Sequence, residues 1–169
     1  MLKEIKLVAK EDIFLEYEDE KGKGQVLFSA IKPYWDYSCE EDYEGGFAHI
    51  VDDKRVLAVL SVASGQGGVV IVWNTETGTP EHISQADFCQ AAAIYNGEVY
   101  TLAIVRQFGA EPSAVVEKCK YGTMDAFAEC ESVQSISMDC FDDYRGNTEE
   151  LSLIVDESGI RLFLKDKEI

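Results

Sequence analysis

Residues 55–73 read R-V-L-A-V-L-S-V-A-S-G-Q-G-G-V-V-I-V-W, and this stretch decides the fold. Residues 55–63 and 68–73 are short, almost uninterrupted apolar runs that are rich in β-branched side chains. Such runs are typical of strands that are buried on both faces of a sheet. The glycine-rich residues 64–68 lie between the two runs, so the sequence predicts an antiparallel hairpin.

Alternation of apolar and polar residues extends this β pattern along the chain. We expect further strands at residues 25–31, 98–106, 113–120, 133–141, 151–155 and 159–165. We expect the central core to include Val56, Leu57, Val59, Leu60, Val70, Val72, Leu102 and Ile104.

Residues 84–95 allow either a helix or a strand. They begin with a sequence like a capping box, S-Q-A-D, and place Phe88, Ala92 and Tyr95 on one helical face. The alternative is a strand at residues 90–95 in a hairpin that turns at residues 96–97 (N-G). We favour the helix because three consecutive alanines suit it better.

The expected fold is therefore α+β, with a mainly antiparallel β-sheet and one or two packed helices in a single domain, residues 1–169. The second helix would start at Cys39 and be broken by Gly45 and Gly46. An all-β sandwich or a partial β-propeller is the alternative class. Residues 53–57 and 96–100 are similar and lie 43 positions apart, near the repeat length of propeller blades, but the expected strands are too few for a closed propeller.

Charge is the strongest compositional signal. The 169 residues contain 32 Asp and Glu against 15 Lys and Arg, which gives a formal net charge of -17. Such a surface repels phosphate backbones and anionic lipids, so we expect neither nucleic-acid nor membrane binding. It attracts basic proteins and speeds their encounter.

The remaining composition predicts a cytoplasmic protein. The N-terminal residues do not resemble a signal peptide, and no apolar run reaches the length of about 20 residues that a membrane-spanning helix needs. The five cysteines are scattered and odd in number, which favours thiols in a reducing compartment over a disulfide framework.

The sequence lacks familiar catalytic signatures, namely a P-loop, a G-x-S-x-G elbow and an H-E-x-x-H motif. His49 and His82 are the two histidines, and no ligand pair has the close spacing of a zinc site. We therefore predict that the protein is not an enzyme, with no catalytic residues, no bound metal and no cofactor.

Three acidic clusters stand out, within residues 16–20, 36–44 and 139–150. The second cluster interleaves carboxylates with aromatic residues, a combination that suits a protein interface. We expect the partner-binding surface to comprise Tyr34, Trp35, Asp36, Glu40, Glu41, Asp42, Tyr43 and Glu44. The alternative is that Trp35 and Tyr43 pack inward and cover a sheet edge.

Several short motifs follow one another in a recognisable order. They are Y-W-D at residues 34–36, D-Y at 42–43, and the strands at 56–63 and 69–73, the last ending in Trp73. This order resembles that of some immunity proteins of bacterial contact-dependent growth-inhibition systems. The family pattern has a tryptophan soon after the Asp-Tyr pair, where this chain has G-G-F at residues 45–47. The resemblance implies a small cytosolic protein that neutralises a toxin domain, often a nuclease.

Charge, missing motifs and this resemblance together predict an acidic immunity or inhibitor protein that caps the active site of a basic toxin. One alternative is a β-rich interaction or assembly module. Another is an enzyme that uses cysteine or carboxylate chemistry, which a pocket lined by His49 or His82 beside a cysteine would indicate.

Overall fold

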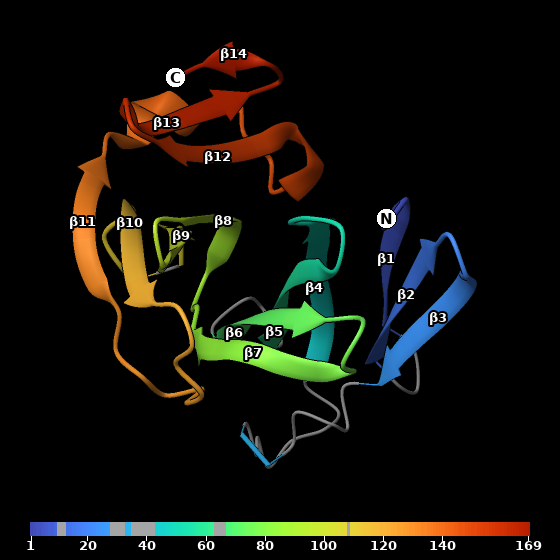
Figure 1. Cartoon of the computed structure of the whole chain (residues 1–169). Coiled ribbons are helices and arrows are strands. Elements are labelled where there is room, and N and C mark those ends of the chain that lie inside the picture. The colour runs from blue at the N-terminus through green and yellow to red at the C-terminus, as the bar shows by residue number, and fades with distance from the viewer. Residues whose placement is uncertain (10–12, 28–32, 35–42, 63–66, 108) are drawn as a thin grey trace. The chain divides into compact units, whose positions relative to one another are not determined.

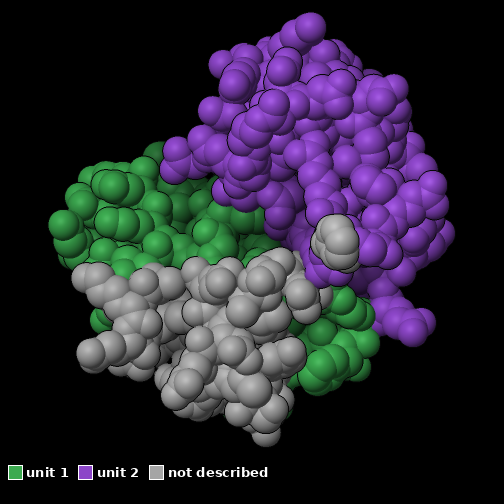
Figure 2. All heavy atoms as spheres, turned by 180° about the vertical axis from the view of Figure 1, so that it is seen from behind, with its two compact units in different colours: residues 1–87, 122–128 green, residues 88–121, 129–169 purple. Residues whose placement is uncertain are grey.

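The computed structural model describes residues 1–9, 13–27, 33–34, 43–62, 67–107 and 109–169 (Figure 1). The chain divides into two compact units. Unit 1 comprises Met1–Asp87 with Gly122–Ala128, and unit 2 comprises Phe88–Tyr121 with Glu129–Ile169 (Figure 2). Each unit is built from two antiparallel sheets and has its own apolar core.

Unit 1 contains a three-stranded and a four-stranded meander. The first has the order β1-β2-β3 and the second the order β4-β5-β6-β7. Their bounds are β1 (Glu4–Ala9), β2 (Ile13–Asp19), β3 (Gly22–Leu27), β4 (Tyr43–Ile50), β5 (Arg55–Val62), β6 (Gly68–Asn74) and β7 (Thr79–Gln85).

Unit 2 repeats this plan with a four-stranded meander, of order β11-β10-β9-β8, and a three-stranded one, of order β12-β13-β14. Two short 3-10 helices, η4 (Met138–Phe141) and η5 (Thr148–Glu150), lie in sequence between the two sheets. The strands are β8 (Cys89–Tyr95), β9 (Glu98–Val105), β10 (Ser113–Lys120), β11 (Glu131–Ile136), β12 (Leu151–Asp156), β13 (Gly159–Leu164) and β14 (Lys167–Glu168).

The hairpin of β5 and β6 forms the centre of unit 1, as its sequence predicts. All seven residues of β6 are buried, and so are Val56 to Leu60 of β5. Strands with apolar residues on both faces can only be accommodated between two covering layers. The expected core is confirmed, because all eight of its predicted members are buried.

Glycines in this sheet allow a close approach between neighbouring strands. A Cβ atom on Gly46 would overlap the carbonyl oxygen of Val59 on the paired strand β5. Gly46 therefore belongs to a strand, β4, and the prediction that Gly45 and Gly46 end a helix is wrong. The start proposed for that helix, Cys39, lies outside the described residues.

The helix predicted at residues 84–95 is also wrong. Residues 79–85 and 89–95 form β7 and β8, and Phe88 between them has a φ of 53°. A bulky residue in this left-handed region interrupts a right-handed helix. Asn96 and Gly97 have φ values of 47° and 78°, as a type I′ hairpin turn requires, so the alternative hairpin is the correct one.

The α+β class is consequently wrong, and the all-β alternative is correct. The described residues contain strands and 3-10 helices but no α-helix. Each sheet consists of strands that are consecutive in the sequence, which is the up-and-down topology of propeller blades and differs from the interleaved strands of a Greek-key sandwich. The two similar segments at 53–57 and 96–100 precede or open β5 and β9, each the second strand of a four-stranded meander.

Most other strand predictions agree with the structure, with two instructive differences. The strand predicted at 133–141 ends at Ile136, and the segment continues as η4, in which Phe141 is fully buried. Strands β1, β2, β4, β7 and β14 have no counterpart in the prediction, because charged residues, glycine or proline interrupt or replace an apolar pattern there.

Large-to-small substitutions at the centre of each unit should lower stability strongly. Replacing Leu102, which is fully buried in β9, or Val59 in β5 with alanine should reduce the free energy of unfolding by about 2–4 kcal/mol, through lost apolar burial and a residual cavity. Val133→Ala is the control. This side chain is 43% exposed, so its truncation should cost less than about 0.5 kcal/mol. Chemical denaturation of the three variants measures these differences, and losses below about 0.5 kcal/mol at both buried positions would contradict the placement of β5 and β9.

Candidate functional site

The structure describes only part of the surface that the sequence predicts as the partner-binding site. Tyr34 is an exposed residue, with 39% of its surface accessible, and Tyr43 and Glu44 are the first two residues of β4. The remaining predicted members, Trp35, Asp36, Glu40, Glu41 and Asp42, lie outside the described residues. The surface therefore stays a prediction.

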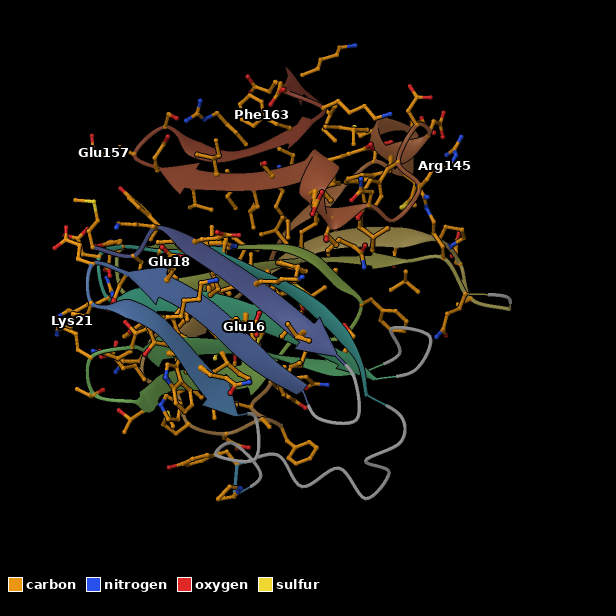
Figure 3. The ribbon with its side chains drawn as sticks, turned by 90° about the vertical axis from the view of Figure 1, so that its right-hand side faces the viewer. Glu16, Glu18, Lys21, Arg145, Glu157 and Phe163 are labelled. Carbon is orange, nitrogen blue, oxygen red and sulfur yellow. The ribbon has the colours of Figure 1, made fainter. Side chains whose placement is uncertain are left out.

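The first acidic cluster, residues 16–20, is divided between two environments. Glu16 and Glu18 point away from β2 on the outer face of its sheet (Figure 3). Asp19 instead organises the β2–β3 turn, because its Oδ1 accepts hydrogen bonds from the backbone N–H groups of Lys21 and Gly22 at 2.7 and 3.1 Å. Glu20 is exposed and lies 3.9 Å from the N-terminal amine.

Strand pairing places cations beside Glu16 and Glu18. Glu18 lies opposite Glu4 on β1 and Lys23 on β3, while Glu16 lies opposite Lys6. These residues line a hollow of about 300 Å³. The hollow has mixed charge and low net charge, so it is a weak site for a cationic partner. The sequence analysis did not predict this hollow because it did not predict β1. Without β1, the pairing of Lys6 with Glu16 cannot be inferred.

The third acidic cluster lies on a segment that is held firmly in unit 2. Phe141 and Tyr144 are buried and contact each other edge to face, with ring centroids 6.4 Å apart. Between these two anchors, Asp142 and Asp143 are exposed. Burial of every third residue is the pattern of a 3-10 turn, in which side chains at i and i+3 lie on the same side.

Arg106 fixes this segment to the end of β9. Its Nη2 donates to the carbonyl oxygen of Phe141 at 2.6 Å, and its Nη1 donates to that of Tyr144 at 2.8 Å. The Tyr144 hydroxyl donates to Oε1 of Gln90 on β8 at 2.7 Å, and burial raises the pKa of Tyr144 to about 12. Unit 2 therefore presents Asp142 and Asp143 from a rigid support.

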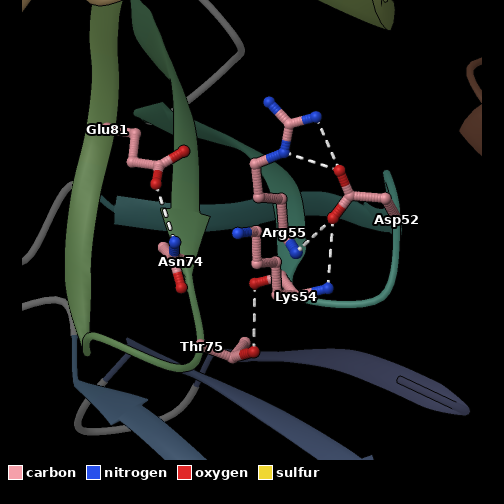
Figure 4. Close-up of polar contacts among 6 residues, drawn as sticks. All are labelled: Asp52, Lys54, Arg55, Asn74, Thr75 and Glu81. Carbon is pink, nitrogen blue, oxygen red and sulfur yellow. Dashed lines mark hydrogen bonds and ion pairs between the residues drawn. The ribbon is translucent and has the colours of Figure 1, made fainter. Parts of the chain in front are cut away.

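Several described cations are engaged with carboxylates of their own unit. Asp52 receives the side chain of Arg55 at 2.6 Å and the backbone N–H groups of Lys54 and Arg55 (Figure 4). Burial alone would raise the pKa of Asp52, but these hydrogen bonds and the charge of Arg55 together hold it below its usual value. Further pairs join Lys118 to Glu98 and Glu131, Arg161 to Asp156, and Lys165 to Glu150.

His82 and Cys89 are both buried. His82 is fully buried, and its Nε2 lies 2.9 Å from the Ser84 hydroxyl. Cys89 is buried, and burial raises its pKa to about 12, so it carries almost no thiolate near neutral pH. The hollow described above is lined by neither His49 nor His82.

Metal-ligating side chains are not gathered in the part of the chain that the structure describes. No group of three or more His, Cys, Asp or Glu side chains among these residues is arranged to hold a metal ion. None of the described segments forms a helix long and apolar enough to cross a membrane.

Comparison with known proteins gives a likeness of fold. No family model and no curated protein matches the chain. Among solved structures, the chain is similar to an α-L-arabinofuranosidase (CtGH43) from Clostridium thermocellum, with 10% sequence identity and a TM-score of 0.45. The match covers 94% of this chain and 59% of that chain, so this chain spans less than two thirds of that protein.

The prediction that the protein is not an enzyme is corrected: it rested on missing sequence motifs alone, and the solved structure similar to this chain is described as an α-L-arabinofuranosidase. Missing sequence motifs are a poor basis for excluding catalysis, since carboxylate-based chemistry needs two groups that meet only in the fold. The likeness concerns the fold and brings neither an activity nor a substrate to this chain.

Protonation of His49 should destabilise the protein. Burial lowers the pKa of His49, so the unfolded chain, with a histidine pKa of about 6.5, binds this proton more readily than the folded chain. The stability that a neutral His49 contributes is present above pH 6.5 or so and is lost as the pH falls towards its folded pKa. The difference in unfolding free energy between the native protein and His49→Gln should therefore decrease on acidification, by at most about 1.4 kcal/mol per pH unit. A difference that stays constant between about pH 7.5 and 5.5 would contradict the partial burial of this imidazole.

The thiol of Cys89 should resist alkylation in the folded protein. Iodoacetamide at about pH 8 should leave Cys89 unmodified while it labels the unfolded chain, because the folded thiol is both buried and protonated. Peptide mapping by mass spectrometry locates the label. Cys140, which is partly exposed, is the internal comparison, and equal labelling of the two cysteines would show that Cys89 is accessible.

Proposed function

We propose that this chain binds a basic protein and neutralises it, as an immunity protein does with a toxin domain. The observation that carries the proposal is the net charge of -17. A charge of this size attracts a cationic partner over distances of about a Debye length and raises the rate of association. The resemblance at residues 34–73 supports an immunity role of the contact-dependent growth-inhibition type.

The internal ion pairs support this proposal. Each ion pair within the chain locally neutralises one positive and one negative charge and leaves the excess of carboxylates unchanged. Arg55, Lys118, Arg161 and Lys165 are all engaged in this way. Exposed carboxylates such as Asp142 and Asp143 therefore face solvent without the neutralising effect of these four cations.

The proposed contact surface is the segment from Tyr34 to Glu44. Tyr34 supplies an exposed aromatic ring, and aromatic anchors surrounded by charges are typical of tight interfaces. Carboxylates at such a surface would occupy the cationic active-site cleft of a nuclease, where the phosphates of its substrate otherwise bind. The proposal places the protein in the cytoplasm, where an incoming toxin would act.

Binding should depend on where the negative charge is removed. The triple variant Glu40→Lys, Glu41→Lys, Asp42→Lys should slow association with a basic nuclease toxin domain and flatten the salt dependence of the rate. The matched control is Glu16→Lys, Glu18→Lys, Glu20→Lys. Both variants change three charges from -1 to +1 and so shift the net charge from -17 by 6, to -11.

Stopped-flow or surface-plasmon-resonance measurements at several salt concentrations separate the outcomes. A larger loss of association rate in the first variant supports the surface from Tyr34 to Glu44. Equal losses in both variants indicate that net charge acts without a defined surface. A toxin domain that neither binds the native protein nor loses nuclease activity in its presence would refute the proposed function.

A further inference from the structure

Strand β11 is the outer strand of the four-stranded sheet of unit 2, at the end of the order β11-β10-β9-β8 (Figure 1). In the described part of the chain, β11 pairs with β10 alone. Its first five residues are exposed and the sixth is partly buried. An edge of this kind presents backbone N–H and C=O groups that another strand can pair with.

Two edge strands of unit 1, β7 and β3, are protected in ways that β11 is not. The outer side of β7 is covered by the segment 122–128, with hydrogen bonds from Ile83 N–H to Thr123 and from Asp125 N–H to Ile83 at 2.7 and 3.0 Å. Strand β3 carries Lys23 and follows Lys21, and edge lysines discourage pairing because a second strand would have to desolvate them.

The sequence of β11, E-S-V-Q-S-I, contains neither lysine nor proline. It has one irregularity, a shift in register at Val133, opposite Val116 and Glu117 of β10. Such a bulge bends and twists the strand locally. An added strand would therefore pair over a short length, about three to six residues.

Negative charge lies at both ends of this edge. Glu129 and Glu131 stand at its start, and Asp139 follows three residues after its last residue. Lys118, the cation closest in register, is already shared between Glu98 and Glu131 at 3.9 and 3.5 Å. A second copy of this chain, which also carries -17, would be repelled. A segment bearing lysine or arginine would be attracted.

We propose that the edge of β11 accepts an extended, cationic segment of a protein partner as an additional strand. Backbone hydrogen bonds would supply affinity, and cationic side chains near the ends of the added strand would contact Glu129, Glu131 and Asp139. The inference rests on the proposed function only for the sign of the partner's charge.

The probe is the capped heptapeptide Ac-Lys-Val-Lys-Val-Lys-Val-Lys-NH2, labelled for fluorescence anisotropy. It should bind, and it should protect amides of β11 from hydrogen exchange. A peptide of the same sequence with N-methylated valines keeps the charge but loses backbone donors, so its affinity should be at least about tenfold lower. The acidic analogue with glutamate in place of lysine should not bind.

A matched pair of protein variants tests the location. Val133→Lys with Ser135→Lys introduces two cations on β11 and should lower the affinity for the heptapeptide at least about tenfold. Ser152→Lys with Ile154→Lys makes a similar change, with the same gain of charge, at exposed positions of β12 in the same unit. This control should lower the affinity for the heptapeptide less than about threefold. Circular dichroism confirms that both variants remain folded.

Three results would overturn the inference: equal binding of the N-methylated peptide, equal losses in the two double variants, or protection that appears on β3 and not on β11. The outcome is separable from that of the proposed function. A toxin domain that binds with unchanged affinity to the β11 variant would leave the function intact and refute the edge. Peptide binding at β11 without toxin binding would support the edge and refute the proposed function.

Discussion

The structure of unit 1 depends on the pairing of β5 with β6, two strands that have apolar side chains on both faces. Val59 lies opposite Val70 and Leu57 opposite Val72, and all four side chains are buried. Such a pair is unsuited to the edge of a sheet, and β4 and β7 flank it on either side. Because both of its faces are apolar, both faces must also be covered. Apolar burial of this kind, worth about 25 cal/mol per Å² of surface removed from water, is the main favourable contribution to folding. Gly46 and Gly68 are part of the same constraint, because a Cβ atom at either position would collide with a backbone oxygen of β5.

Unit 2 forms its apolar core from strands with fewer continuous apolar residues. Its sheet carries polar residues such as Thr101 and Gln90, and its core is completed by Phe141 and Tyr144 from outside the sheet. Arg106 links the backbone of this segment to β9 by two hydrogen bonds. A guanidinium group suits this role because its planar fork can reach two carbonyl oxygens at once and stays charged at all ordinary pH values. The exposed acidic residues of the segment are thereby held in place by a buried framework.

The sequence predicts the strands whose apolar patterns are long, and it fails where tertiary contacts decide. The strands at residues 55–63, 68–73 and 113–120 follow from local composition. Residues 84–95 do not, because three alanines favour a helix while the left-handed Phe88 and the Asn96-Gly97 turn impose a hairpin. Phe141 shows the same limit: its apolar neighbours suggest a longer β11, whereas its side chain fills the core from a 3-10 turn. The candidate sites illustrate the point most clearly, since the pairing of Lys6 with Glu16 requires β1, which the sequence pattern conceals.

Strong negative charge and an open sheet edge have opposite effects on association, and their combination is selective. An open edge such as β11 would by itself pair with many extended segments, including copies of this chain. Net charge adds a repulsive term between copies that grows as two like-charged chains approach, and an attractive term for cationic segments. Specificity is a difference between two affinities, so repulsion of the wrong partner contributes as much as attraction of the right one. The internal ion pairs of Arg55, Lys118 and Arg161 strengthen this selection, because they engage cations that an acidic chain could otherwise contact. The net negative charge therefore allows β11 to remain exposed, because repulsion between copies of the chain opposes self-association at this edge.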